Sequence, residues 1–140
     1  MLFRSGTTPF YEQDVVQWTY TTKELPAQTF EVKLIARLQK GWQVNNQRED
    51  GATIPTVIRF NKHPSLELQG CLRITESLYK VFDPEAPSYL KTDSFAQWVK
   101  LHSVTRHTLN GTIQFQAHTD HESLPPTVTQ FDIPLKVSGL

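Results

Sequence analysis

The chain of 140 residues has one cysteine, Cys71, so it cannot form an internal disulfide. It has no run of about 18 apolar residues, which excludes a transmembrane helix, and its first residues lack the apolar stretch of a secretory signal. The 14 basic and 14 acidic residues give zero net charge and form no cluster, so a surface for nucleic acid or an anionic membrane is not expected. A hydrophobic core must therefore stabilise the chain without disulfides, and its length suffices for one domain of that kind.

What the chain does contain is a hydrophobic pattern of period two. Between Phe30 and Leu38 nearly every second residue is apolar, and Glu31, Lys33 and Arg37 lie between them. This alternation predicts a β-strand with one buried and one wet face. The same alternation, or a composition rich in β-branched and aromatic residues, predicts further strands at Val15–Tyr20, Phe95–Leu101, Ile113–Ala117 and Phe131–Val137.

Turn-forming residues separate these segments, and no stretch shows the apolar stripe of a helix. Many strands with such punctuation are typical of an all-β, immunoglobulin-like antiparallel β-sandwich. We expect residues 14–140 to form this single domain, and residues 1–13, which are polar and lack a period, to form a flexible arm. The chain reversals are predicted at Lys40-Gly41, Asp50-Gly51, Asn110-Gly111 and Leu124-Pro-Pro126.

Six short motifs follow one another in order between about Val15 and Val137. They are Lys40-Gly-Trp-Gln-Val44, Gly51-Ala-Thr-Ile-Pro-Thr56 with Phe60, Leu68-Gln-Gly70, Val81-Phe-Asp-Pro84, Phe95-Ala-Gln-Trp-Val-Lys-Leu101, and Leu124-Pro-Pro126 with Phe131. Together they resemble the amino-terminal domain of the thiol:disulfide interchange protein DsbD, in the form common in Bacteroidetes-type bacteria. The resemblance implies an immunoglobulin-like sandwich, a periplasmic location and a surface that meets other proteins.

The chemistry of that family needs two cysteines, five residues apart, on either side of a hairpin loop, because one thiolate attacks a partner disulfide and the other resolves the mixed disulfide. The matching positions here are His118 and Ser123, neither of which can exchange disulfides. Cys71 lies on a different segment. The resemblance therefore implies a non-catalytic relative without a cofactor, which acts as a monomeric interaction or accessory module linked to thiol–disulfide or cytochrome biogenesis systems.

The expected interaction surface combines the loop from His118 to Pro126 with residues 78–90. In the resembled family an aromatic cap loop shields the active cysteines, and residues 78–90 are the candidate for such a segment. An ordinary long connection held by aromatic side chains is an equal alternative. The family's sandwich domain meets thioredoxin-fold proteins, so a partner of this kind is expected. The surface residues are Tyr79, Phe82, Tyr89, His118, Asp120, His121, Leu124 and Pro125.

The same loop also permits a metal-binding hypothesis. His118, Asp120 and His121 carry side chains that bind zinc or copper, and Glu122 or His107 would complete the ligand set. The alternative is that these polar residues only fill a loop that has lost a disulfide. Two nearby histidines without a third assigned ligand are a weak pattern.

Cys71 and the tryptophans supply the remaining candidates. A reactive Cys71 would allow thiol chemistry, whereas the simpler interpretation is a small residue at a strand end. Trp42 is expected in the core. Trp18 and Trp98 lie on the polar side of their local alternation, and would mark a protein-binding face if both are exposed.

Overall fold

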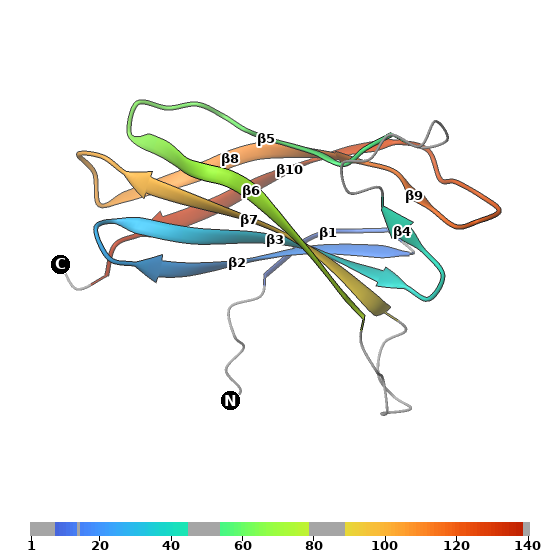
Figure 1. Ribbon diagram of the computed structural model, residues 1–140. Coiled ribbons are helices and arrows are strands. Elements are labelled where there is room, and N and C mark those ends of the chain that lie inside the picture. The colour runs from blue at the N-terminus through green and yellow to red at the C-terminus, as the bar shows by residue number, and fades with distance from the viewer. Residues whose placement is uncertain (1–7, 14, 45–53, 79–88, 139–140) are drawn as a thin grey trace.

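In the computed structural model the chain folds into a sandwich of antiparallel strands (Figure 1), and the described residues are 8–13, 15–44, 54–78 and 89–138. A five-stranded sheet has the order β1-β2-β3-β7-β6, a three-stranded sheet has the order β10-β8-β5, and β4 pairs with β9. The predicted all-β, immunoglobulin-like sandwich is confirmed. The strands are β1 (Thr8–Glu12), β2 (Val16–Leu25), β3 (Thr29–Gln39), β4 (Gln43–Val44), β5 (Val57–Phe60), β6 (Leu66–Leu78), β7 (Tyr89–Leu101), β8 (Arg106–Phe115), β9 (Ala117–His118) and β10 (Thr127–Lys136).

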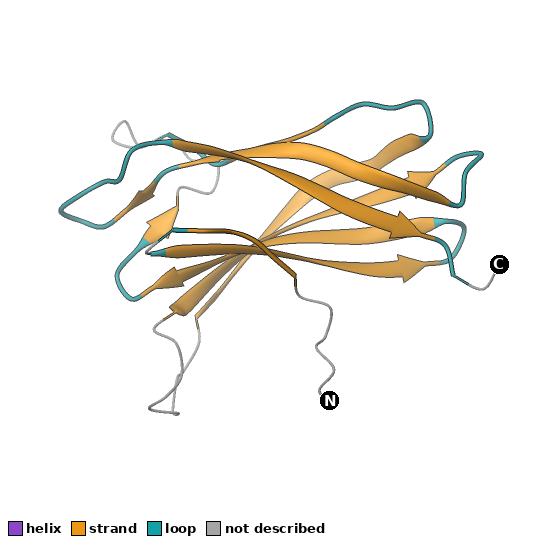
Figure 2. Ribbon diagram, turned by 180° about the vertical axis from the view of Figure 1, so that it is seen from behind, coloured by secondary structure: helices purple, strands orange, loops and turns teal. Residues whose placement is uncertain are grey.

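The core lies between the two larger sheets, and the period-two pattern decides which side chains enter it. In β3 the alternate residues from Phe30 to Leu38 are buried, while Glu31 and Lys33 face outward. Phe131 of β10 closes the core from the opposite sheet. Figure 2 shows that the strands run along the length of the molecule and that loops form its two ends.

Trp18 is fully buried, unlike the exposed position that its local pattern allowed. Its ring centroid lies 5.9 Å from that of Phe95 in the same sheet and 5.6 Å from that of Phe115 in the facing sheet. Such aromatic contacts add to the free energy gained by burial. Trp42 packs partly buried against the core, as expected.

The prediction of a flexible arm at residues 1–13 is wrong for Thr8–Glu12, which forms β1 and pairs with β2. The Phe10 ring lies 6.1 Å from Tyr20 and 6.3 Å from Phe131. The ring centroids of Tyr11 and Phe115 are 5.9 Å apart. The sequence of β1 has no clear alternation, and its register with β2 shifts between Pro9 and Tyr11. Aromatic partners that are distant in the sequence therefore stabilise this strand.

The chain reversal predicted at Asn110-Gly111 is also wrong, because β8 continues through both residues. An added Cβ at Gly111 would stand 2.1 Å from the Arg59 carbonyl oxygen and 2.4 Å from Cζ of Phe131. Glycine is therefore needed here for close approach of neighbouring strands and not for a turn. The reversal at Lys40-Gly41 is confirmed, with a φ of 86° at Gly41.

Candidate functional site

The loop that resembles a redox loop forms a tight hairpin at one end of the sandwich. The strand β9 leads into it, and Ser123 returns to form an isolated antiparallel bridge with His118. The Thr119 amide donates to the Glu122 carbonyl at 2.8 Å, and the Leu124 amide donates to the Ala117 carbonyl at 2.9 Å. The two positions that match the family's cysteines therefore face each other directly.

The two flanking hydrogen bonds make His118 and Ser123 a non-hydrogen-bonded pair of the ladder. In such pairs the Cα atoms lie about 4.5 Å apart, which is within the range of roughly 4.4–6.8 Å that a disulfide spans. The backbone is thus shaped for a cross-strand disulfide, but it carries an imidazole and a hydroxyl in place of the thiols.

Two polar side chains build this hairpin. The Thr119 hydroxyl oxygen accepts hydrogen bonds from the amides of His121 and Glu122, both at 3.1 Å, and so stabilises the reversal. Gln116 lies between β8 and β9, and its side-chain amide both donates and accepts a hydrogen bond. Its Nε2 donates to the Leu124 carbonyl and its Oε1 accepts from the Ile54 amide, each at 3.0 Å.

Gln116 was not singled out from the sequence. A glutamine in an alternating strand carries no signal of its own, because its outward place in Gln114-Phe115-Gln116 is what the pattern of a wet face requires. Only the spatial neighbourhood of Ile54 and Leu124 reveals that it positions the hairpin.

The metal ligands proposed from the sequence lie around the same hairpin without forming a cluster. His118 is half-buried, and Asp120 and His121 are exposed. Across the residues that the structure describes, there is no group of three or more His, Cys, Asp or Glu side chains that could hold a metal ion. The metal hypothesis therefore receives no support from the side-chain arrangement.

His107 cannot complete the proposed ligand set, and this part of the hypothesis is wrong. It lies at the start of β8, where its ring centroid is 4.3 Å from that of His63. A strand advances about 3.3 Å per residue, so the length of β8 separates His107 from His118 in β9. The two histidines belong to opposite ends of the sandwich.

The other surface residues divide into two groups. Leu124 packs partly buried against the core, and Pro125 beside it is exposed. Tyr79 and Phe82 lie outside the described residues, and so does the side chain of Tyr89, whose backbone opens β7 opposite Gln39. The structure brings together the hairpin residues, and the suggested cap segment stays a prediction.

Cys71 lies far from the hairpin in the fold, exposed in β6 at the edge of the five-stranded sheet. It does not end a strand, as the simpler interpretation assumed, but stands in a bulge between Gln69 and Arg73 where the register with β7 shifts. Gly70 has a φ of 76° there. The side-chain amide of the buried Gln97 donates to the carbonyls of Gln69 and Gly70, at 3.1 and 3.3 Å, and so holds the bulge.

Comparisons with known proteins extend this description to the fold. No protein-family model matches the chain, and no curated protein matches it. The chain is similar to the N-terminal periplasmic domain of ScsB from Proteus mirabilis, with a TM-score of 0.54 and 13% identity over 95% of this chain and 51% of that one. It is also similar to the GAE domain of GGA2p from Saccharomyces cerevisiae, with a TM-score of 0.53 and 8% identity over 93% of this chain and 99% of that one.

Likeness at these identities establishes the fold and not the activity. The DsbD-like domain fold implied by the sequence motifs is supported by the ScsB domain, and the chain spans about half of that structure's length. No helix that could cross a membrane occurs in the described part of the chain.

Proposed function

We propose that this protein is a non-catalytic relative of the DsbD amino-terminal domain, which serves as a protein-interaction or accessory module of the cell envelope. The observation that carries the proposal is the His118–Ser123 pair, because it combines the backbone of a disulfide hairpin with side chains that cannot exchange disulfides. The periplasmic origin of the similar ScsB domain supports a periplasmic location. The linked systems would be those of thiol–disulfide exchange or cytochrome biogenesis.

The hairpin has properties of a recognition surface. Asp120, His121 and Glu122 are exposed at its tip, and Pro125-Pro126 stiffens its return. A stiff loop loses little conformational entropy when it binds, so more of the contact energy appears as affinity. A thioredoxin-fold protein is the proposed partner, since the resembled sandwich domain meets proteins of that kind.

A titration of the isotope-labelled protein with a purified thioredoxin-fold domain tests this proposal. We expect the amide resonances of residues 117–124 to shift on binding. The exposed substitution His121→Asp in the hairpin should weaken binding by roughly tenfold. Lys136→Asp is the matched control, because Lys136 is exposed in β10 where that strand pairs with Arg106 at the opposite end of the sandwich.

Two results would overturn the assignment. One is the absence of any resonance shift at millimolar partner concentration. The other is binding that shifts resonances near Lys136 and leaves the hairpin unchanged, since the partner would then use the wrong end of the sandwich.

A further inference from the structure

The sandwich has an open side where β5 and β6 run near each other but belong to different sheets (Figure 1). Among the described strands, β5 pairs with β8 and β6 pairs with β7, so each is the edge of its sheet. The strand β5 has 4 residues and β6 has 13, so β5 covers only a part of its neighbour. A cavity of about 430 Å³ lies on this side, lined by Phe60, Asn61, Lys62, His63, Pro64, Leu66 and Leu68.

Leu68 gives this cavity its apolar floor. It pairs with Val99, which is fully buried, so Leu68 faces the interior of the sandwich. Nevertheless 46% of its surface is exposed, because β5 ends at Phe60 and does not reach across it. Contact between this apolar surface and water is unfavourable. A bound apolar group would cover the surface, and the burial would favour binding.

A second recess lies on the outer face of the same edge strand. It has a volume of about 250 Å³ and is lined by Gln69, Gly70, Cys71, Arg73 and Trp98. Trp98 is 40% exposed, and the Arg73 guanidinium carbon stands 5.2 Å from its ring centroid. The start of β6 is thus flanked by an apolar recess on each face. Side chains of an extended peptide alternate between two faces, so such a peptide would fill both recesses.

The backbone of β6 is oriented to receive an added strand at this place. The His102 amide donates to the Ser65 carbonyl at 2.9 Å, which fixes the phase of the ladder between β6 and β7. By that phase Glu67 directs its backbone groups toward β7, and Leu68 directs its N–H and C=O toward the open edge. Edge groups of this kind template the pairing of another strand.

Charge on the two sides of the groove selects the peptide. The residues that line the two recesses include Lys62 and Arg73 and no acidic residue. Arg59 adds an exposed guanidinium on β5. The nearby Glu67 forms a hydrogen bond with His102 Nε2 at 2.5 Å, which lowers the Glu67 pKa, so this carboxylate stays ionised and is directed at His102.

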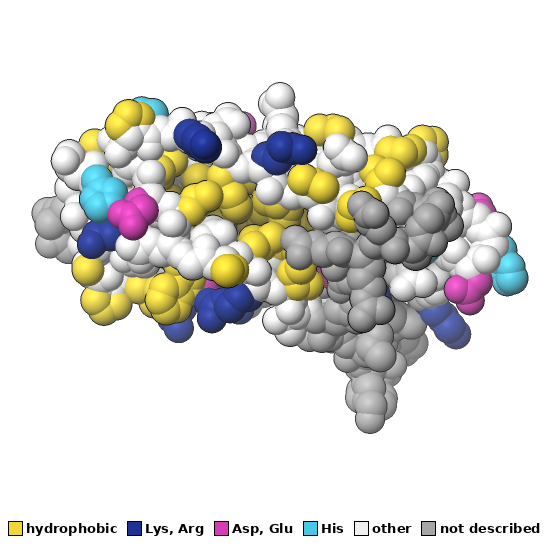
Figure 3. Space-filling view, turned by 45° about the horizontal axis from the view of Figure 1, so that its top comes forward, with side chains coloured by type: hydrophobic (Ala, Val, Ile, Leu, Met, Phe, Trp, Pro, Cys, Tyr) yellow, Lys and Arg dark blue, Asp and Glu magenta, His cyan; other side chains and the backbone are white. Residues whose placement is uncertain are grey.

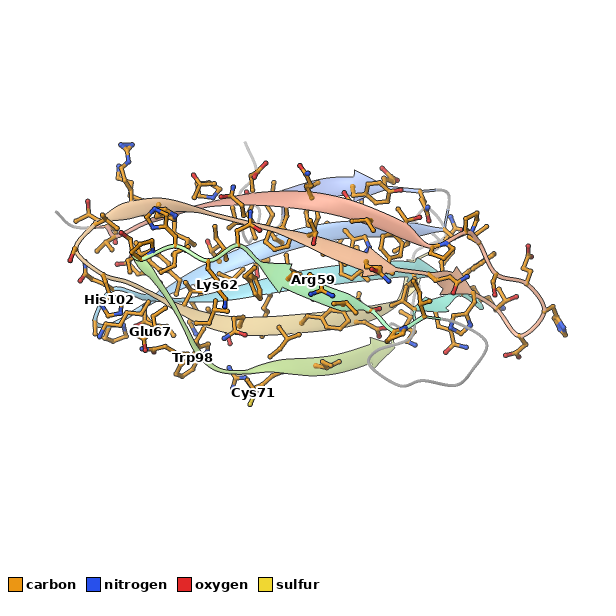
Figure 4. The ribbon with its side chains drawn as sticks, turned by 90° about the horizontal axis from the view of Figure 1, so that it is seen from above. Arg59, Lys62, Glu67, Cys71, Trp98 and His102 are labelled. Carbon is orange, nitrogen blue, oxygen red and sulfur yellow. The ribbon has the colours of Figure 1, made fainter. Side chains whose placement is uncertain are left out.

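Apolar side chains lie along the groove, and charged side chains lie beside them. Figure 3 shows a band of hydrophobic side chains along this face with Lys and Arg side chains on both sides of it. In Figure 4, Arg59 lies on β5 and Lys62 lies in the loop that follows it, while Cys71 and Trp98 lie on the β6 side and Glu67 points toward His102. Arg59 and Lys62 thus supply cationic side chains on the β5 side of the groove, while Arg73 on the other side also pairs with Glu31 at 3.4 Å.

We propose that this groove binds an extended segment of a partner protein, which adds as a strand to the edge of β6. The apolar side chains of the segment enter the recesses at Leu68 and Trp98, and its acidic side chains pair with Arg59, Lys62 and Arg73. This proposal is independent of the function assigned to the hairpin, which lies at the other end of the sandwich.

A phage-displayed library of random peptides is the probe. Selection on the native protein should enrich sequences with two apolar residues an odd number of positions apart, so that they point to opposite faces, and with Asp or Glu beside them. Synthetic versions of these peptides should lose roughly tenfold or more in affinity for Leu68→Asp. Val128→Asp is the matched control, because Val128 is 62% exposed on β10, away from the groove.

The charge assignment has its own variant, because Leu68→Asp can disturb folding. Lys62→Glu with Arg73→Glu changes two exposed side chains, and should weaken the acidic peptides by roughly tenfold, with a larger effect at low salt. The proposal is overturned if no peptide is enriched, if the enriched peptides lack acidic residues, or if they bind the Leu68→Asp and charge-reversed proteins as tightly as the native one.

Discussion

The hairpin end and the open β5–β6 edge differ in backbone geometry and in surface chemistry. The hairpin presents His118 and Ser123 in the geometry of a disulfide pair, yet its surface is polar and its tip carries Asp120 and His121. The edge offers no paired reactive groups, but it has apolar recesses at Leu68 and a strand edge that can accept hydrogen bonds. Backbone geometry and surface chemistry are thus separable, and the same sandwich can keep one without the other.

Each of these regions is shaped by one glutamine. Gln116 bonds to Ile54 and Leu124 and so ties the hairpin to its neighbours. Gln97, which is 4% exposed, bonds to the carbonyls of the β6 bulge. An amide side chain has both donors and an acceptor, and can therefore replace ladder hydrogen bonds where a strand is interrupted.

The largest expected effect separates the two regions by displacing β5. In Gly111→Ala the new methyl group meets the Arg59 carbonyl and the Phe131 ring, so we expect the free energy of unfolding to fall by about 3 kcal/mol. Peptide binding at the groove should be lost with it, because Phe60 lines the groove. Urea denaturation measures the change.

Gly41→Ala is the control for the Gly111 substitution. Gly41 has a φ of 86° and no atom within 4 Å of an added Cβ, so alanine there costs only about 1 kcal/mol through backbone strain. Equal losses in the two variants would show that close packing at Gly111 is not the cause.

The second prediction tests the pairing geometry of the hairpin. In a Cys71→Ser background, His118→Cys with Ser123→Cys should form a disulfide under oxidising conditions and raise the free energy of unfolding by about 2 kcal/mol, as expected for so short a closed loop. The melting temperature of this variant should fall on reduction, whereas that of the native protein should be indifferent to reductant. Two free thiols in the oxidised double variant would refute the inferred pairing geometry.

Local pattern and resemblance predicted the parts of the molecule that depend on neighbouring residues. The alternation from Phe30 to Leu38 predicted β3, because a half-buried strand repeats every two residues. The motif ending in Leu124-Pro-Pro126 predicted the hairpin and the two facing positions.

Contacts between distant segments could not be predicted in this way. Asn110-Gly111 has the composition of a turn, but Arg59 and Phe131 require the glycine for another reason. β1 is a strand because Phe10 finds aromatic partners elsewhere in the fold. The groove at Leu68 exists because β5 is short and forms the edge of its sheet. The hydrophobic period of a segment predicts a strand, but it does not reveal the order of the strands in a sheet.

A smaller effect concerns the charge at the groove. The hydrogen bond from His102 lowers the Glu67 pKa from its ordinary value of 4.5. The stability that this contact adds is therefore fully present above that value, and is lost as the pH falls through the lowered pKa. His102→Ala should return the Glu67 pKa toward 4.5 in a carbon-13 titration. His107→Ala removes a histidine whose ring packs against His63 instead, and an equal change of the Glu67 pKa in that variant would contradict the assigned cause.

The smallest expected effect is the response of the hairpin to metal. Zinc or copper added to chelator-stripped protein should bind no more tightly than about millimolar, because within the described part of the chain His118, Asp120 and His121 do not form a group of three ligands around one point. Calorimetry of the native protein and of His118→Ala measures this. Tight binding of one ion, lost in His118→Ala, would give the hairpin a chemistry of its own and would remove the contrast with the groove. Equal, weak heats in both proteins would exclude a metal site at His118 and keep the contrast between the hairpin and the groove.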